Sequence, residues 1–344
     1  MKTEIKKRDD GEVELNITVP SAEFIKYWDK GFKSLQAKVE MDGFRKGNVP
    51  EHVVIEKYGE MAVLEEMANV AINETYVQAV TEHKIHVIAD PHIHVKKLSK
   101  ADDFIYMAHV AVYPEIALPD YKKIAKSVAK AETTTATEEE VMTVLTELAR
   151  GRMPAKGTDN VAQDTETGED VVALPAIDDA FAQSFGEHFP TLESLKSKVR
   201  ENLNLEKTST NKEKNRATII EEILKTVNVK LPQVMIDGET DRMLGQMEGD
   251  ITRMGGKWAD YLTHAGKTEE DLRTEYRDIA EKRALSQVIL AEIAKSEKMY
   301  PTADEIDVEV IKVMTSMPDA KEENVKAFVT QMLMNEKVLQ MLEA

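Results

Sequence analysis

From Thr137 onward the chain carries an almost unbroken helical pattern, and this feature most constrains its fold. Thr137 with Glu140, and Thr302 with Glu305, place a hydroxyl at an N-cap and a glutamate three residues later, which is the capping-box arrangement. Thr268 precedes an acidic first turn that complements the helix dipole. Prolines and glycines mark the breaks. The pattern predicts helices at 137–150, 178–185, 191–226, 232–253, 257–264, 269–298, 303–316 and 323–342.

The first 118 residues instead predict an α+β domain. Alternating polar and apolar runs typical of strands lie at 4–7, 12–19, 92–98 and 104–113, the first two joined by the hairpin turn signal Asp9-Asp10-Gly11. Ser21 is expected to be the N-cap of a helix with an apolar face. Pro50 is expected to open a short helix that ends at Tyr58 and Gly59, followed by a longer helix to about Lys84.

Residues 43–50, Gly-Phe-Arg-Lys-Gly-Asn-Val-Pro, form the most distinctive local motif. Gly43 and Gly47 supply the backbone freedom of a tight, protruding loop, and Pro50 suits the first position of a following helix. Phe44 beside Arg45 and Lys46 is typical of a docking tip, where the ring fills a hollow and the cations meet an anionic surface. From the residues alone, a turn whose phenylalanine folds back onto the core is equally compatible.

This motif resembles the signature loop of bacterial trigger factor, the ribosome-associated chaperone that meets nascent chains at the exit tunnel. The resemblance extends to 113–118, 174–181, 195–203 and Leu231-Pro232. It implies an α+β N-terminal ribosome-binding domain followed by an elongated, mostly α-helical chaperone domain with arms. It also implies contact with a large-subunit protein and ribosomal RNA near the tunnel exit. The residues that it assigns to this contact are Gly43, Phe44, Arg45, Lys46, Gly47 and Pro50.

The middle of the chain departs from that family. The usual trigger factor has a prolyl-isomerase domain of the FK506-binding type inserted here, whereas residues 151–175 hold hardly any large apolar side chains. So short a segment does not bury a core without staples, and the chain has no cysteine. We therefore expect no catalytic residues and no isomerase activity. The expected division is a ribosome-binding domain (1–118), a connector with the first arm helix (119–150), a linker (151–175) and a client-binding chaperone domain (176–344).

Composition bears on partners and compartment. The net charge of −18 argues against a general nucleic-acid binder, because phosphate affinity needs clustered cations. Residues 24–48 are an exception, since their cations outnumber their acids, and they suit one oriented contact with an RNA-rich surface. No apolar run approaches the length of a membrane-spanning helix, and residues 1–15 lack the apolar core of a signal peptide. A cytoplasmic protein without membrane contact is expected.

Five of the eight histidines fall between His83 and His109. His92 and His94 would share one face of a strand, and an antiparallel neighbour would bring His109 near them. A zinc or nickel site is conceivable, but no carboxylate or cysteine stands at a diagnostic spacing. Surface or half-buried histidines are therefore favoured, and neither a metal nor another cofactor is expected.

Methionines recur along the predicted C-terminal helices. Core packing is the better interpretation of any single one, but the flexible, polarizable side chain also lets a surface repack around varied partners. In a chaperone some of them are expected to face the client. The candidates are Met235, Met243, Met247, Met254, Met314, Met317, Met332 and Met334.

The favoured function is that of a ribosome-associated chaperone that binds nascent and unfolded polypeptides without ATP and delays their misfolding. No phosphate-cradling glycine loop, metalloprotease motif or nucleophile triad indicates an enzyme. Two alternatives stay open, a residual peptidyl-prolyl cis-trans isomerase and a holdase that does not need the ribosome. A homodimer of free molecules also stays open.

Overall fold

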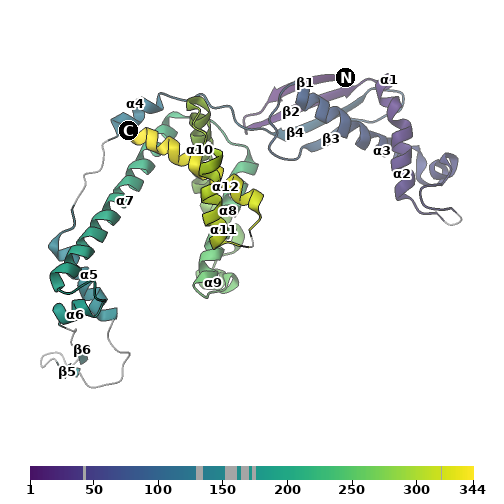
Figure 1. Cartoon of the computed structure of the whole chain (residues 1–344). Helices are drawn as coiled ribbons and strands as arrows, with labels where there is room; N and C mark the ends of the chain where they lie inside the picture. The colour runs from purple at the N-terminus through teal and green to yellow at the C-terminus, as the bar shows by residue number, and fades with distance from the viewer. Residues whose placement is uncertain (42–43, 129–134, 152–160, 164–169, 173–175, 319) are drawn as a thin grey trace. The chain divides into compact units, whose positions relative to one another are not determined.

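The computed structural model describes residues 1–41, 44–128, 135–151, 161–163, 170–172, 176–318 and 320–344. The chain divides into two compact units. One contains Met1–Pro119 and Leu224–Val338, and the other contains Asp120–Ile223 and Leu339–Ala344. The prediction of an α+β N-terminal region followed by a long helical region is confirmed (Figure 1).

The first unit begins with a four-stranded antiparallel sheet (Figure 1, purple to blue). Its strands β1 (Lys2–Lys7), β2 (Glu12–Val19), β3 (His92–Lys97) and β4 (Phe104–Ala111) are arranged in the order β1-β2-β4-β3. The predicted hairpin is confirmed, and Gly11 takes the positive φ of +78° that its turn requires. Alternate residues of β2 and β4 face inward, so a continuous apolar core forms on one side of the sheet.

Three helical segments follow β2, namely α1 (Ser21–Phe24), a 3₁₀ turn (Ile25–Tyr27) and α2 (Trp28–Lys38). The prediction that Ser21 is the N-cap is wrong. Pro20 holds that position, and the Ser21 N–H donates to Asp103 Oδ1 at 2.9 Å, so a distant carboxylate satisfies the helix start.

Helix α3 (Glu51–Glu82) carries the predicted interruption, because Gly59 has φ 80° and ψ 158°. Pro50 precedes this helix as its N-cap and does not occupy the first helical position. Its carbonyl oxygen accepts from the Val53 and Val54 N–H groups, and its ring-fixed φ of −60° fits the extended conformation of a cap as well as it fits a helix.

The remaining helices of the first unit are α8 (Gln233–Arg253), α9 (Trp258–Ala265), α10 (Glu269–Glu297), α11 (Ala303–Ser316) and most of α12 (Glu322–Glu343). Helices α8 and α10 pack together over a core that includes Ile236, Ala284 and Val288. Helices α11 and α12 pack around Val310 and Val329. The capping box predicted at Thr302 is confirmed, and Thr268, predicted only to precede an acidic first turn, also forms a full capping box with Asp271.

The second unit contains α4 (Tyr121–Ser127), α5 (Glu138–Gly151), α6 (Asp179–Gln183) and most of α7 (Leu192–Thr226). Its core joins α5 through Leu145, α6 through Phe181 and α7 through Leu195. Two short strands, β5 (Val161–Gln163) and β6 (Asp170–Val172), pair antiparallel in the segment predicted as a linker. The sequence pattern did not predict α4, β5 or β6, and the other residues of 152–175 lie outside the described part of the chain.

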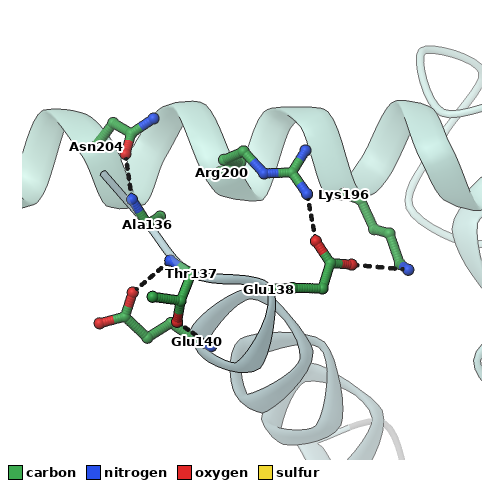
Figure 2. A network of polar contacts seen from close by, with 7 residues as sticks. All are labelled: Ala136, Thr137, Glu138, Glu140, Lys196, Arg200 and Asn204. Carbon is green, nitrogen blue, oxygen red and sulfur yellow. Dashed lines mark hydrogen bonds and ion pairs between the residues drawn. The ribbon is translucent and has the colours of Figure 1, made fainter. Parts of the chain in front are cut away.

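A polar network fixes the start of α5 against α7 (Figure 2). The predicted capping box is present, because the Thr137 N–H donates to Glu140 Oε2 at 2.8 Å and the Glu140 N–H donates to Thr137 Oγ1 at 3.3 Å. Glu138 accepts from both Lys196 and Arg200, and the hydrogen bond from Lys196 is the main reason why the pKa of Glu138 is lowered. Side chains of both helices therefore fix where the first turn of α5 lies against α7.

Candidate functional site

The motif that the sequence singled out lies in the loop of residues 40–50, which joins the end of α2 to the start of α3. Two valines close the neck of this loop, since Val39 and Val49 are buried on either side of it. They belong to one apolar cluster with Leu35, Val54 and Val63. The loop is thus anchored at its base by side chains of α2 and α3.

The returning limb of the loop forms a reverse turn. The Asn48 N–H donates to the Arg45 carbonyl oxygen at 3.0 Å, and Gly47, the third residue of the turn, has a φ of +81°. A type II turn requires a positive φ at this position, which explains the glycine. The Phe44 N–H donates to the Met41 carbonyl oxygen at 3.1 Å. Gly43 lies outside the described residues.

The three residues at the tip are all exposed. The Phe44 side chain is 42% exposed, so the ring does not fold back into the core. Lys46 Nζ lies 3.0 Å from Glu40 Oε1, whereas the Arg45 guanidinium has no ion pair within the described part of the chain. Among the described residues the tip therefore presents to solvent one aromatic ring and one cation that has no ion-pair partner.

Polar side chains support the base of the loop. Gln36 Nε2 donates to the Val49 carbonyl oxygen at 2.7 Å, and Trp28 Nε1 donates to Glu51 Oε1 at 2.9 Å. Lys100 Nζ lies 3.9 Å from the centroid of the Trp28 ring, which is the geometry of a cation–π contact. These contacts link α2, the loop and the first turn of α3.

The cations of α2 and of the 3₁₀ turn before it divide into two groups. Lys30 pairs with Glu74 at 2.6 Å and Lys38 pairs with Glu66 at 2.7 Å, and the hydrogen bond from Lys30 lowers the pKa of Glu74. Exposed Lys26 and Lys33 make no ion pair with any described residue. The basic character that the sequence predicted for residues 24–48 is thus partly neutralised within the domain.

The candidate methionines differ widely in exposure. Met254 is 81% exposed, and Met317 and Met332 are exposed as well. Met235 and Met243 pack against the α8–α10 core, and Met314 packs between α11 and α12. Met247 and Met334 are half-buried. Of the eight candidates only Met254, Met317 and Met332 are therefore exposed, and Met332 is the least exposed of them at 38%.

Sequence reasoning missed other exposed apolar side chains on the same helices. Ile311 is 67% exposed, and Val308 one turn earlier and Phe328 on α12 are exposed too. Helical periodicity could have identified two of them, because it puts Val308 and Ile311 on the face of α11 opposite the buried Val310. That signal is weak until the partner helix is known.

His92, His94 and His109 lie on the face of the sheet away from the apolar core, whereas His83 follows the end of α3 and His86 precedes β3. His92 stands opposite His109 in the register of β3 and β4, and the His94 and His109 rings are 5.6 Å apart. Arg8 Nη1 lies 2.6 Å from His109 Nδ1, so this nitrogen accepts from the guanidinium. Among the described residues no group of three or more histidines and carboxylates has the geometry to hold a metal ion. None of the described helices is both long and apolar enough to cross a membrane.

Comparison with known protein families gives two matches. Residues 1–148 match the model of the bacterial trigger factor protein (TF), and residues 191–343 match that of the bacterial trigger factor protein (TF) C-terminus. Residues between these two ranges are not covered by either match.

Among curated proteins, the trigger factor of Clostridium botulinum strain Hall is 25% identical in an alignment of 386 residues that covers 91% of this chain and 90% of the relative. The trigger factor of Shouchella clausii strain KSM-K16 is 26% identical over 400 residues, covering 95% and 92%. A solved structure described as "Promiscuous Substrate Recognition in Folding and Assembly Activities of the Trigger Factor Chaperone" is similar in fold. Its TM-score is 0.57 at 17% identity, with 100% of this chain and 99% of that chain covered.

Proposed function

The chain belongs to the trigger factor family of ribosome-associated chaperones, because the two family matches together span most of its length, and we propose that its 40–50 loop is the ribosome contact. One observation carries this proposal, namely that Phe44 is 42% exposed beside exposed Arg45 and Lys46, on a loop whose two ends are held by the buried side chains of Val39 and Val49. An exposed aromatic ring adds no stability to its own domain, but it adds binding affinity when it enters an apolar hollow of a partner.

The residues of the tip take different parts in this contact. Phe44 enters an apolar hollow on a protein of the large subunit, and Arg45 binds a carboxylate or a phosphate of ribosomal RNA. On binding, Lys46 leaves its exposed ion pair with Glu40 and contacts the partner instead. Little stability is lost in this step, because surface ion pairs contribute little. Gly47 and Pro50 shape the loop, and Gly43 is kept in the proposal as part of the same contact.

Ribosome co-sedimentation tests the proposal. Replacement of Phe44, Arg45 and Lys46 by alanine is expected to abolish pelleting with ribosomes while the helical fold is retained. The matched control is the double alanine variant of Lys57 and Tyr58, an exposed cation and aromatic ring 5.5 Å apart on α3 of the same domain. Undiminished pelleting of the triple variant would mean that the loop is not the anchor.

Salt titration separates the two kinds of contact. If Arg45 binds phosphate, Arg45→Ala weakens binding and lowers the slope of log affinity against log salt by about one. Phe44→Ala is expected to weaken binding without a change of slope, because the ring carries no charge. An unchanged slope in Arg45→Ala would argue for a protein carboxylate, or for no ionic contact.

Client binding is assigned to exposed apolar side chains of the helical region. Met254, Met317 and Met332, together with Val308, Ile311 and Phe328, offer scattered apolar contacts that suit unfolded segments of varied sequence. A micromolar dissociation constant corresponds to about −8 kcal/mol, which a few such contacts supply, so release needs no ATP. Serine at the three methionines should weaken suppression of the aggregation of an unfolded protein, and unchanged suppression would exclude them.

We also propose that this chain lacks the isomerase activity of its family. Support comes from the unmatched residues between the two family matches, and from a 386-residue alignment that is longer than this chain of 344 residues. A refolding assay limited by proline isomerisation tests this. No acceleration is expected at substoichiometric protein, and catalytic turnover would refute the proposal.

The remaining expectations are kept as parts of the same proposal. They are a cytoplasmic location and the division into 1–118, 119–150, 151–175 and 176–344, while a homodimer of the free protein stays an open alternative. Size-exclusion chromatography with light scattering at several concentrations tests the dimer. A mass that stays monomeric at micromolar concentrations would remove it.

A further inference from the structure

Gln36 of α2 forms a side-chain hydrogen bond to the 40–50 loop. Its Nε2 donates to the Val49 carbonyl oxygen at 2.7 Å in a partly buried position. Within the described part of the loop, no other side chain from outside it hydrogen-bonds to the loop backbone. The Val49 side chain is fully buried, so its carbonyl group lies at the covered neck of the loop. A backbone acceptor at such a place needs a partner.

The other contacts of the loop do not fix its direction from α2. The turn between Arg45 and Asn48 and the pair between Lys46 and Glu40 are both internal to the loop. Packing of Val39 and Val49 holds the neck, but apolar contact is non-directional. The hydrogen bond from Gln36 is directional, because donor and acceptor must align.

We propose that Gln36 is a positioning residue for docking, which rests on the ribosome contact proposed above. It holds the limb after the tip in one place and so presents Phe44 in its binding orientation before the partner arrives. A loop that is already ordered loses less conformational entropy on binding, and affinity rises by that difference. Gln36 itself touches no partner in this scheme.

Two substitutions separate the hydrogen bond from the volume of the side chain. Gln36→Ala removes the donor and shortens the side chain. Gln36→Glu keeps nearly the same size but places an acceptor against the Val49 carbonyl oxygen, so the contact becomes repulsive. The control is Gln78→Ala, because Gln78 lies on α3 of the same domain and donates to Glu82 on the surface of the same helix.

Equilibrium binding to purified ribosomes is the first measurement. Gln36→Ala is expected to raise the dissociation constant about three- to tenfold, and Gln36→Glu at least as much, while Gln78→Ala stays near wild type. Amide hydrogen exchange of residues 44–49 should become faster in both Gln36 variants, while exchange of residues 60–82 should be unchanged. A dissociation constant of Gln36→Ala equal to that of wild type would overturn the proposal.

A double-mutant cycle with Phe44 distinguishes positioning from general support of the fold. In a Phe44→Ala background, Gln36→Ala is expected to weaken binding by less than about twofold, because the ring that it orients is gone. Losses that simply multiply would show that Gln36 acts elsewhere. If the triple alanine variant of the tip binds like wild type, the ribosome contact itself fails. If that variant loses binding and Gln36→Ala does not, only the positioning role fails.

Discussion

Gly31 on α2 lies so close to Met67 on α3 that a Cβ atom at position 31 would stand 2.7 Å from the Met67 Cα. The two helices therefore cross nearly backbone to backbone, and only glycine fits at this point. The crossing also carries polar contacts, because Ser34 Oγ donates to Glu66 Oε2 at 2.7 Å. Since α2 ends in the 40–50 loop, this crossing sets the base from which the tip projects.

Gly31→Ala is expected to destabilise the N-terminal part of the chain by about 1–3 kcal/mol, because the added methyl group meets backbone that has no room to move aside. Urea unfolding followed by tryptophan fluorescence measures this, since Trp28 lies on the same helix. Gly238→Ala on α8 is the control, with nothing within 4 Å of its Cβ and an expected gain of up to about 1 kcal/mol. Equal stability of Gly31→Ala and wild type would contradict so close a crossing.

Glu66 gives the same crossing a pH dependence. Burial raises the pKa of this carboxyl, but the hydrogen bonds from Lys38 and Ser34 outweigh it, and the pKa of Glu66 lies below its ordinary value of 4.5. A carboxyl with a depressed pKa adds stability that is present above the ordinary value and is lost as pH falls through the folded-state pKa. Glu66→Gln should therefore cost about 1 kcal/mol at neutral pH.

The stability difference between wild type and Glu66→Gln should then shrink as the pH falls below 4.5. Denaturant midpoints at a series of pH values measure it. Glu65→Gln serves as the control, because exposed Glu65 makes no ion pair with any described residue. A difference that grows toward acid would reverse the assigned sign.

Thr302 caps α11, since its Oγ1 accepts from the Glu305 N–H while Glu305 Oε2 accepts from the Thr302 N–H at 2.7 Å. Thr302→Ala is expected to destabilise the α11–α12 pair by about 1 kcal/mol. Thr315→Ala near the other end of the helix removes a hydroxyl that only donates back to the Ile311 carbonyl oxygen, so it should be neutral or slightly stabilising. Site-resolved hydrogen exchange in α11 distinguishes the two variants. Equal effects of Thr302→Ala and Thr315→Ala would show that the Thr302 cap does not stabilise the helix.

Local rules account for most of the helical fold. Caps such as Thr268 act through neighbouring residues, so the sequence alone located the starts of the long helices well. The prediction that Ser21 is an N-cap was wrong because this helix start depends on a distant residue, Asp103, which accepts from the Ser21 N–H. Helix α4 was missed, although Asp120 caps it by accepting from the Lys123 N–H, because the helix spans only Tyr121–Ser127 and shows little periodicity.

The site depends more on tertiary contacts than the fold does. Position in the loop suggested Phe44, but its exposure follows from the buried neck, which pairs Val39 with Val49 across the loop. The role of Gln36 had no local signal, since a glutamine in a helix is ordinarily a solvated residue. Met254 and Met314 looked alike in sequence, yet Met254 at the end of α8 is exposed, whereas the packing of α11 on α12 leaves Met314 half-buried.

Tyr106 supplies a buried hydroxyl contact beneath the sheet. Thr75 Oγ1 donates to the Ala71 carbonyl oxygen at 2.6 Å, so the Tyr106 hydroxyl, 2.8 Å away, is the donor to Thr75 Oγ1. Tyr106→Phe keeps the packing and removes one hydrogen bond, at an expected cost of about 1 kcal/mol at neutral pH. Thr75 retains its acceptor in this variant, which keeps the cost small.

At alkaline pH the order of stabilities should change. Burial raises the pKa of Tyr106 from 10.0 to about 12, so between these values the unfolded chain loses a proton that the folded chain keeps. The contribution of the Tyr106 hydroxyl to the free energy of unfolding is therefore constant below pH 10. Above pH 10 it falls by about 1.4 kcal/mol per pH unit, until the folded form also ionises. Tyr106→Phe lacks this loss, and so its deficit should vanish and then reverse as the pH rises past 10. Denaturant unfolding of both proteins from neutral pH to pH 11, with tyrosinate absorbance followed in parallel, measures the crossing, and a deficit that stays constant would show that Tyr106 titrates like an exposed tyrosine.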